Sequence, residues 1–109
     1  MTRPGASFKE NLQTLPGVSD LARIDLTDDA GTVVASILNE PGKQGSLAVY
    51  QHLQEKFGAL TAEAARYGLE LFAEHTADAK NRPGAHPNID RLLAILDGGP
   101  ALQILLIRV

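Results

Sequence analysis

Two histidines and one aspartate in the second half of the chain are the residues best suited to chemistry. His75 and Asp78 are three positions apart, so a helix over this segment places both side chains on one face. His86 follows a Pro83-Gly84 break and can fold back toward them. Two imidazoles and a carboxylate are ligands for zinc, iron or manganese. One hypothesis is therefore a metal site at His75, Asp78 and His86.

A structural role for the same residues is the alternative. The spacing matches no established metal-binding pattern, and the chain has no His-Glu-x-x-His run. In this interpretation His75 makes local hydrogen bonds at the rim of its helix, and His86 lies in the N-cap region before Pro87. The metal hypothesis requires the two imidazole rings to approach closely, because each Zn–N bond is about 2.0–2.1 Å long.

A glycine-rich loop is the second candidate site. The segment Gly42-Lys43-Gln44-Gly45-Ser46 leads from a predicted strand into a predicted helix. Free N–H groups and the helix dipole favour an anion at such a point, and the Lys43 ammonium and the Ser46 hydroxyl can add to its binding. The order of residues is not that of a phosphate-binding Walker A loop. The alternative is a tight loop that needs glycine for its dihedral angles and Ser46 as a helix cap.

Other chemistries lack support in the sequence. The chain contains no cysteine, which removes disulfides, thiolate zinc sites and cysteine nucleophiles. No Gly-x-Ser-x-Gly motif indicates a serine hydrolase. Basic residues near the end of the chain alternate with acidic ones and have no aromatic residues among them, which is typical of a solvated surface and not of a base-stacking platform. We expect no cofactor, and whether the protein is an enzyme stays undecided.

The composition indicates one globular domain. The chain has 109 residues, of which 44% are hydrophobic and 21% charged, with a net charge of −3. The acidic balance counts against a general nucleic-acid binder. The sequence has no signal-peptide pattern and no run of ~20 apolar residues that would span a membrane. We expect a cytoplasmic protein with a flexible tail over residues 1–6 and a single domain over residues 7–109.

Apolar periodicity predicts about four helices. Their ranges are residues 8–15, 47–57, 62–80 and 87–96. Ser7, Ser46 and Thr61 are the expected N-caps, and Gly58 is expected to end the second helix. Gly68, inside the third helix, is costly there, and a close crossing with another helix or chance would explain it.

Alternating and β-branched residues predict three strands. Residues 22–27 and 32–38 form a hairpin around Gly31, and residues 101–109 form an apolar strand that is covered on both faces or paired along both edges. The predicted fold is α+β, in the order α-β-β-α-α-α-β. A small, mainly antiparallel three-stranded sheet carries the helices, and the last strand pairs beside the first.

Several segments resemble an uncharacterised bacterial protein family of about this length. They are Gly45-Ser46-Leu47-Ala48-Val49-Tyr50, Ala73-Glu74-His75-Thr76, His86-Pro87-Asn88-Ile89-Asp90-Arg91-Leu92 and Leu21-Ala22-Arg23-Ile24. The resemblance covers nearly the whole chain from Ser7 onward. It implies a bacterial, cytoplasmic, stand-alone domain and supplies no catalytic residue.

The leading hypothesis is a non-enzymatic binding or interaction module that self-associates. Its basis is the apolar C-terminal strand, because such a strand at a sheet edge is a template for a second chain. The alternative places that strand at the centre of the sheet with both edges used. A second hypothesis is a small metal-dependent or phosphate-recognising enzyme that uses the His75, Asp78 and His86 region or the Gly42–Ser46 loop. Membrane and nucleic-acid partners are not expected.

Overall fold

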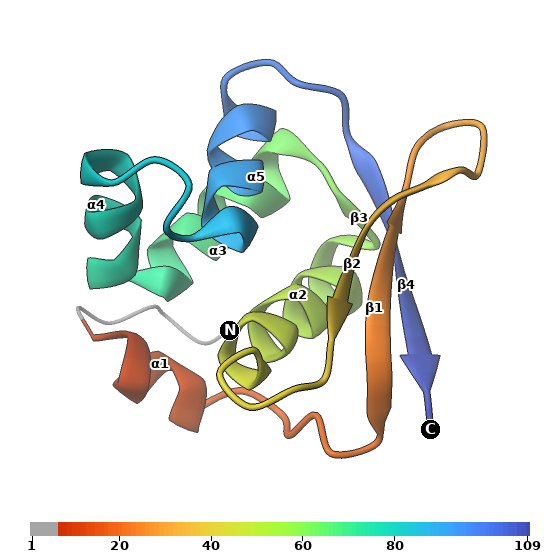
Figure 1. Cartoon of the computed structure of the whole chain (residues 1–109), viewed down its shortest axis with the longest axis horizontal. Helices are drawn as coiled ribbons and strands as arrows, with labels where there is room; N and C mark the ends of the chain where they lie inside the picture. The colour runs from red at the N-terminus through yellow and green to blue at the C-terminus, as the bar shows by residue number, and fades with distance from the viewer. Residues whose placement is uncertain (1–6) are drawn as a thin grey trace.

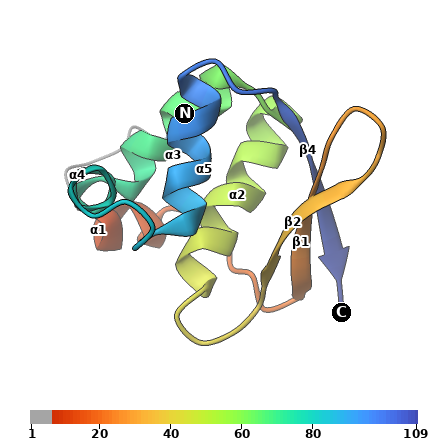
Figure 2. The ribbon, with the colours of Figure 1, turned by 45° about the horizontal axis from the view of Figure 1, so that its top comes forward.

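The computed structural model describes residues 7–109 as an α+β fold in which helices lie on one side of an antiparallel sheet (Figures 1 and 2). The predicted flexible tail, residues 1–6, lies outside this range. No helix in the described part is long and apolar enough to cross a membrane. The elements are α1 (Phe8–Gln13), β1 (Leu21–Thr27), β2 (Val33–Leu38), α2 (Gln44–Phe57), β3 (Ala59–Leu60), α3 (Ala62–Phe72), α4 (Glu74–Asn81), α5 (Pro87–Leu96) and β4 (Leu102–Arg108).

The sheet has the strand order β2-β1-β4-β3 over the described residues. The hairpin is present, with Gly31 at a φ of 84°, and β4 pairs antiparallel beside β1 as predicted. The predicted count of three strands is wrong, because the two-residue strand β3 pairs with the start of β4 at Leu102 and Gln103. A strand this short carries no alternation pattern, so the sequence gives no signal for it.

The hydrophobic core fills the space between the sheet and the helices. Ile24, Leu26 and Ile104 point from the sheet into this core and are buried. The opposite face of the sheet carries no helix, and there Val34, Leu38 and Leu105 keep 52%, 50% and 45% of their surface exposed. Of the two alternatives expected for the last strand, coverage of both faces is wrong, because all the helices of the described chain pack on one side. Pairing along both edges is found in part, because β4 lies between β1 and the short strand β3.

The predicted helix boundaries are wrong in two places. The helix α2 begins at Gln44, so Ser46 lies inside its first turn and the N-cap is Lys43. The predicted helix over residues 62–80 is divided at Ala73, whose φ of 50° and ψ of −118° lie outside the helical region. The described chain therefore has five helices and not four.

The other local predictions are confirmed. The Ser7 side chain accepts a hydrogen bond from the Glu10 N–H, and the Thr61 side chain accepts one from the Ala64 N–H. Gly58 ends α2 at a φ of 80°. Gly68 marks the predicted close crossing: a Cβ at this position would lie 2.9 Å from a methyl carbon of Leu92 in α5 and 3.0 Å from one of Leu53 in α2.

We predict that Gly58→Ala destabilises the fold by about 1–2 kcal/mol, because an L-residue at a positive φ brings its Cβ close to the following carbonyl oxygen. No neighbouring atom lies within 4 Å of that Cβ, so only backbone strain contributes. Gly17→Ala is the matched control, since Gly17 is equally open and has no positive φ. Urea denaturation should show a loss for Gly58→Ala and no loss for Gly17→Ala. Equal effects of the two changes would contradict the explanation.

Candidate functional site

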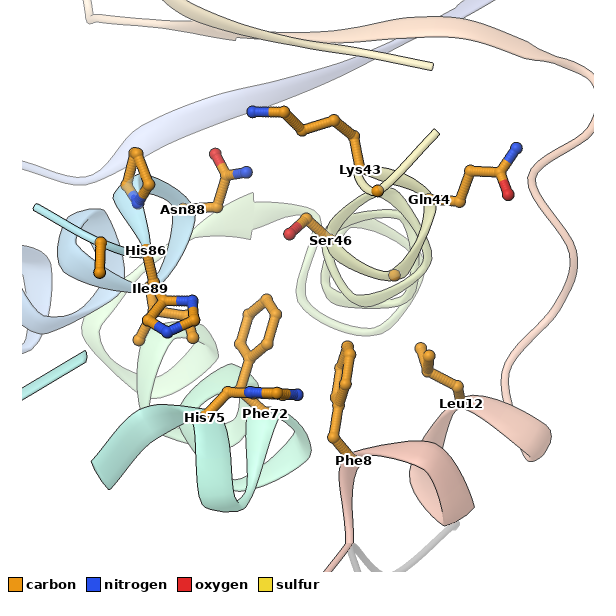
Figure 3. Close-up of a pocket in the computed structure, with 14 residues that line it drawn as sticks. Phe8, Leu12, Lys43, Gln44, Ser46, Phe72, His75, His86, Asn88 and Ile89 are labelled. Carbon is orange, nitrogen blue, oxygen red and sulfur yellow. The ribbon is translucent and has the colours of Figure 1, made fainter. Parts of the chain in front are cut away.

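The two candidate segments of the sequence line one cavity of about 540 Å³ (Figure 3). This volume lies within the usual range for small-molecule sites. The first turn of α2, the start of α5, the first turn of α4 and the N-terminal end of α1 surround it. The lining residues are Phe8, Leu12, Gly42, Lys43, Gln44, Gly45, Ser46, Phe72, His75, Ala85, His86, Pro87, Asn88 and Ile89.

The first turn of α2 forms one wall of the cavity. Its N-cap, Lys43, makes no side-chain capping bond, so the helix start is not closed by its own cap residue. Gly45 lets the ring of Phe8 approach this turn, because a Cβ on Gly45 would lie 2.9 Å from a ring carbon of Phe8. In Figure 3, Ser46 points into the space between Phe72 and Asn88, and Lys43 extends toward the Asn88 side.

Aromatic rings from α1, α3 and α4 form the opposite wall. The rings of Phe8 and Phe72 stack with centroids 5.2 Å apart, and the edge contact of Phe8 with His75 has a centroid distance of 5.0 Å. The Phe8 N–H donates a 2.7 Å hydrogen bond to a carboxylate oxygen of Glu74, and this bond holds the pKa of Glu74 below its usual value. The non-helical backbone at Ala73 lets α4 turn away from α3. His75 therefore joins the same wall as Phe72.

His86 completes the ring of polar side chains. Its Nε2 lies 2.6 Å from a carboxylate oxygen of Asp78, and Arg82 binds the same carboxylate with two nitrogens. The hydrogen bonds from Arg82 and then from His86 keep the pKa of Asp78 well below its usual value. Because an ionised carboxylate only accepts hydrogen bonds, Nε2 of His86 is the donor. The loop before His86 is closed by a 2.9 Å bond from the Gly84 N–H to Asp90.

A buried hydroxyl joins α2 to the start of α5. The Tyr50 hydroxyl donates a 2.6 Å hydrogen bond to the backbone carbonyl of Asn88 and accepts a 3.1 Å bond from Arg91. The same Arg91 nitrogen donates to the Asn88 side chain at 3.0 Å. Burial raises the pKa of Tyr50 to about 12, so the hydroxyl stays a donor throughout the physiological range. These bonds set the distance between the two helix starts that line the cavity.

Most of the predicted site residues, but not all, line the same cavity. His75 and His86 lie side by side with ring centroids 5.7 Å apart, and both face the same cavity as Lys43, Gly45 and Ser46. Asp78 touches His86 but does not line the cavity. Within the described residues, no group of three histidine, cysteine, aspartate or glutamate side chains is placed to hold a metal ion. The metal site at His75, Asp78 and His86 stays a prediction.

Sequence reasoning missed the apolar half of the site. Phe8, Leu12, Phe72 and Ile89 belong to regular helix faces, and their positions indicate only that they pack inward. Asn88 lies within one of the segments that resemble the bacterial family, but no feature of the sequence assigned it to a site. A helix face does not specify which of its residues borders a cavity, so no signal in the chain would have separated these residues from the core.

The lining residues combine cationic and hydrogen-bonding groups with apolar surface. They include the ammonium of Lys43, two imidazoles, a serine hydroxyl and two helix N-termini, and they include no carboxylate. Each helix N-terminus carries roughly half a positive charge. Phe8, Leu12, Phe72 and Ile89 supply the apolar part. The arrangement suits a small anion that also carries an apolar group.

Comparison with known proteins gives a family and no function. The family model described as "Uncharacterized protein conserved in bacteria (DUF2322)" matches residues 8–106, which include every lining residue of the cavity. No curated protein and no solved structure matches the chain. The match extends over almost the whole chain and agrees with the resemblance seen in the sequence. The protein therefore belongs to this conserved bacterial family.

Proposed function

We propose that this protein is a non-enzymatic binding module that holds a small anionic molecule with an apolar part in the cavity between α1, α2, α4 and α5, and that it works as a self-associated protein. One observation carries the first part of the proposal. The glycine-rich helix start and the histidine pair, 29 or more positions apart in the chain, line the same cavity.

The polar end of the ligand is assigned to the α2 side of the cavity. Backbone N–H groups at the start of a helix favour an anion, and here the N-cap supplies no competing acceptor. Lys43 is exposed and can close over the ligand, while Ser46 offers a hydroxyl donor. A phosphate or a carboxylate meets these requirements equally, so the shared property is negative charge on oxygen.

The apolar end is assigned to the aromatic wall. Phe8, Phe72 and His75 present ring faces and edges within about 5 Å of one another, and an aromatic or aliphatic group can pack against them. Binding is favoured over catalysis because the carboxylate beside His86, that of Asp78, does not line the cavity and is bound by both Arg82 and His86. Such an ion-paired carboxylate is a weak base.

We predict that phenyl phosphate binds roughly tenfold more tightly than inorganic phosphate, because only the former reaches both ends of the cavity. Lys43→Gln should weaken both probes by about three- to tenfold, a modest loss for an exposed charge. Lys80→Gln is the matched control, since Lys80 is exposed on α4 and does not line the cavity. Isothermal titration calorimetry measures the affinity of each probe for the unmodified protein and for both variants. Loss of binding in Lys80→Gln, or none in Lys43→Gln, would contradict the assignment.

A thermal-shift panel tests the anion site against the metal-site alternative. A probe at 100 times its dissociation constant stabilises the native state by about 2.7 kcal/mol, which should raise the melting temperature by roughly 10 °C or more. We predict this shift with phenyl phosphate and not with Zn²⁺ or Mn²⁺ on metal-stripped protein. A metal-dependent shift that disappears in both His75→Ala and His86→Ala would replace our proposal with a metal centre.

Self-association, the second part of the proposal, is supported by the incomplete pairing of β4. β1 pairs with β4 along nearly its whole length, whereas β3 pairs only with Leu102 and Gln103. In the described chain, the remainder of that edge has no strand beside it. An unpaired apolar strand edge is a template for another strand. The start of β4 therefore lies inside the sheet, between β1 and β3, whereas the rest of the strand forms a free edge.

A further inference from the structure

We infer that two copies of this protein join through residues 104–108 of β4, which pair antiparallel across a two-fold axis at Leu106. The inference rests on the proposed self-association and names its surface. The strands of the two subunits would then form one continuous sheet with the helices of both copies on the same side. β3 already covers Leu102 and Gln103, so the pairing begins beyond it.

The free segment of β4 has few of the features that protect sheet edges: it contains no proline, and its one charged residue is Arg108 at its end. Charged residues, prolines and bulges normally discourage edge pairing. Ile104, Leu105, Leu106 and Ile107 form an uninterrupted apolar run. Arg108, the charge that ends the run, is bound to Asp20 of the same chain at 2.5 Å. The charge of Arg108 therefore lies at the end of the paired segment and is already paired within its own chain.

The outer edge of the sheet, β2, is a weaker candidate for this contact. Its pairing with β1 has a register irregularity at Val33, and an edge with such an irregularity is less able to accept another strand. Ser36 interrupts its apolar residues and donates a 2.8 Å hydrogen bond to Asp25. Polar residues also flank it, since Thr32 precedes the strand and Asn39 follows it. β4 is thus the edge better suited to a second copy.

The register of the pairing follows from the alternation of side chains. A two-fold axis at Leu106 sets Leu105 opposite Ile107 of the second copy, and Ile107 opposite Leu105 of that copy. These two residues lie on the face of the sheet without helices, where Leu105 is 45% exposed. Directly opposed side chains come within about 4.5–5.5 Å. Pairing thus covers apolar surface that the single chain leaves open.

The partner that fits this segment is a second copy and not an unrelated strand. The three central positions of the free edge meet apolar residues when the strand pairs with itself, since Leu106 meets Leu106 and Leu105 meets Ile107. At the two ends of the paired segment, Ile104 meets Arg108. Shifting the axis to Leu105 would bring Ile107 of one copy opposite Gln103 of the other, which β3 already occupies. The axis at Leu106 uses all the free residues of the strand, and only Val109, which follows β4, then falls opposite Gln103.

Single cysteines can test this register, because the chain contains no cysteine of its own. Opposed Cα atoms in an antiparallel pair lie about 4.5–5.5 Å apart, within the 4.4–6.8 Å range of a disulfide. We expect Leu106→Cys to form a covalent dimer on mild oxidation with oxidised glutathione. Leu105→Cys alone and Ile107→Cys alone should not, because their like positions lie diagonally at about 7–8 Å. A mixture of these two variants should cross-link. Val34→Cys on β2 controls for random oxidation.

Light scattering on the full chain distinguishes a dimer that forms through β4 from one that forms through another surface. We expect a dimer for the unmodified protein, a monomer for Ile107→Lys and an unchanged dimer for Val34→Lys, with circular dichroism confirming that each variant is folded. A dimer that shows no cross-link at residue 106, or that dissociates with Val34→Lys, overturns the β4 interface and leaves self-association standing. A strictly monomeric protein at high concentration overturns both. Neither result changes the affinity for phenyl phosphate, which tests the cavity alone.

Discussion

The hydrogen bond from the buried Tyr50 hydroxyl to the Asn88 carbonyl fixes the geometry on which the candidate site depends. Tyr50 lies in the middle of α2 and Asn88 in the first turn of α5, so this bond determines how far apart the two helix starts are held. A buried hydroxyl without a partner would be costly, and the alternative partner, water, cannot reach it. Arg91 binds both the hydroxyl and the Asn88 side chain and thereby holds the first turn of α5 in register with α2.

The break at Ala73 is the second constraint, and the sequence could not predict it. The helical stripe of Ala62, Ala65, Leu69, Phe72 and Thr76 keeps its steps of three and four across this point, and nothing in it marks Ala73 as different from its neighbours. A positive φ at a residue other than glycine is strained and persists only where the surroundings stabilise it. Here the Glu74 carboxylate accepts the N–H of Phe8, and the Thr76 hydroxyl bonds the Leu69 carbonyl. The break therefore depends on the contact with α1, which is distant in the chain, and helix propensities describe only local preferences.

What the sequence could predict was mainly local and periodic. The caps at Ser7 and Thr61, the end of α2 at Gly58 and the hairpin turn at Gly31 depend on residue type and short-range spacing. The pairing of the last strand beside the first joins distant residues, and it was expected because it leaves the hairpin intact. Both candidate segments, around Lys43 and around His86, were visible from residue type and short-range spacing. That they share one cavity is a property of the tertiary fold. So is the aromatic wall, because Phe8 reaches it only through α1, which lies more than 60 residues from α4.

The helix α2 connects the two surfaces to which we assign function. Its first turn borders the cavity, and its last residue leads through Gly58 directly into β3. β3 is short because Thr61 immediately caps α3, which leaves only Ala59 and Leu60 to pair with β4. Had the chain between Phe57 and Thr61 been longer, β3 could have covered the whole edge of β4 and closed it to a second copy. The free edge is therefore a direct consequence of where two helices end and begin. The cavity borders the first turn of α2, whereas the free edge begins beyond β3, which follows the last turn, so ligand binding and the pairing at β4 use different residues.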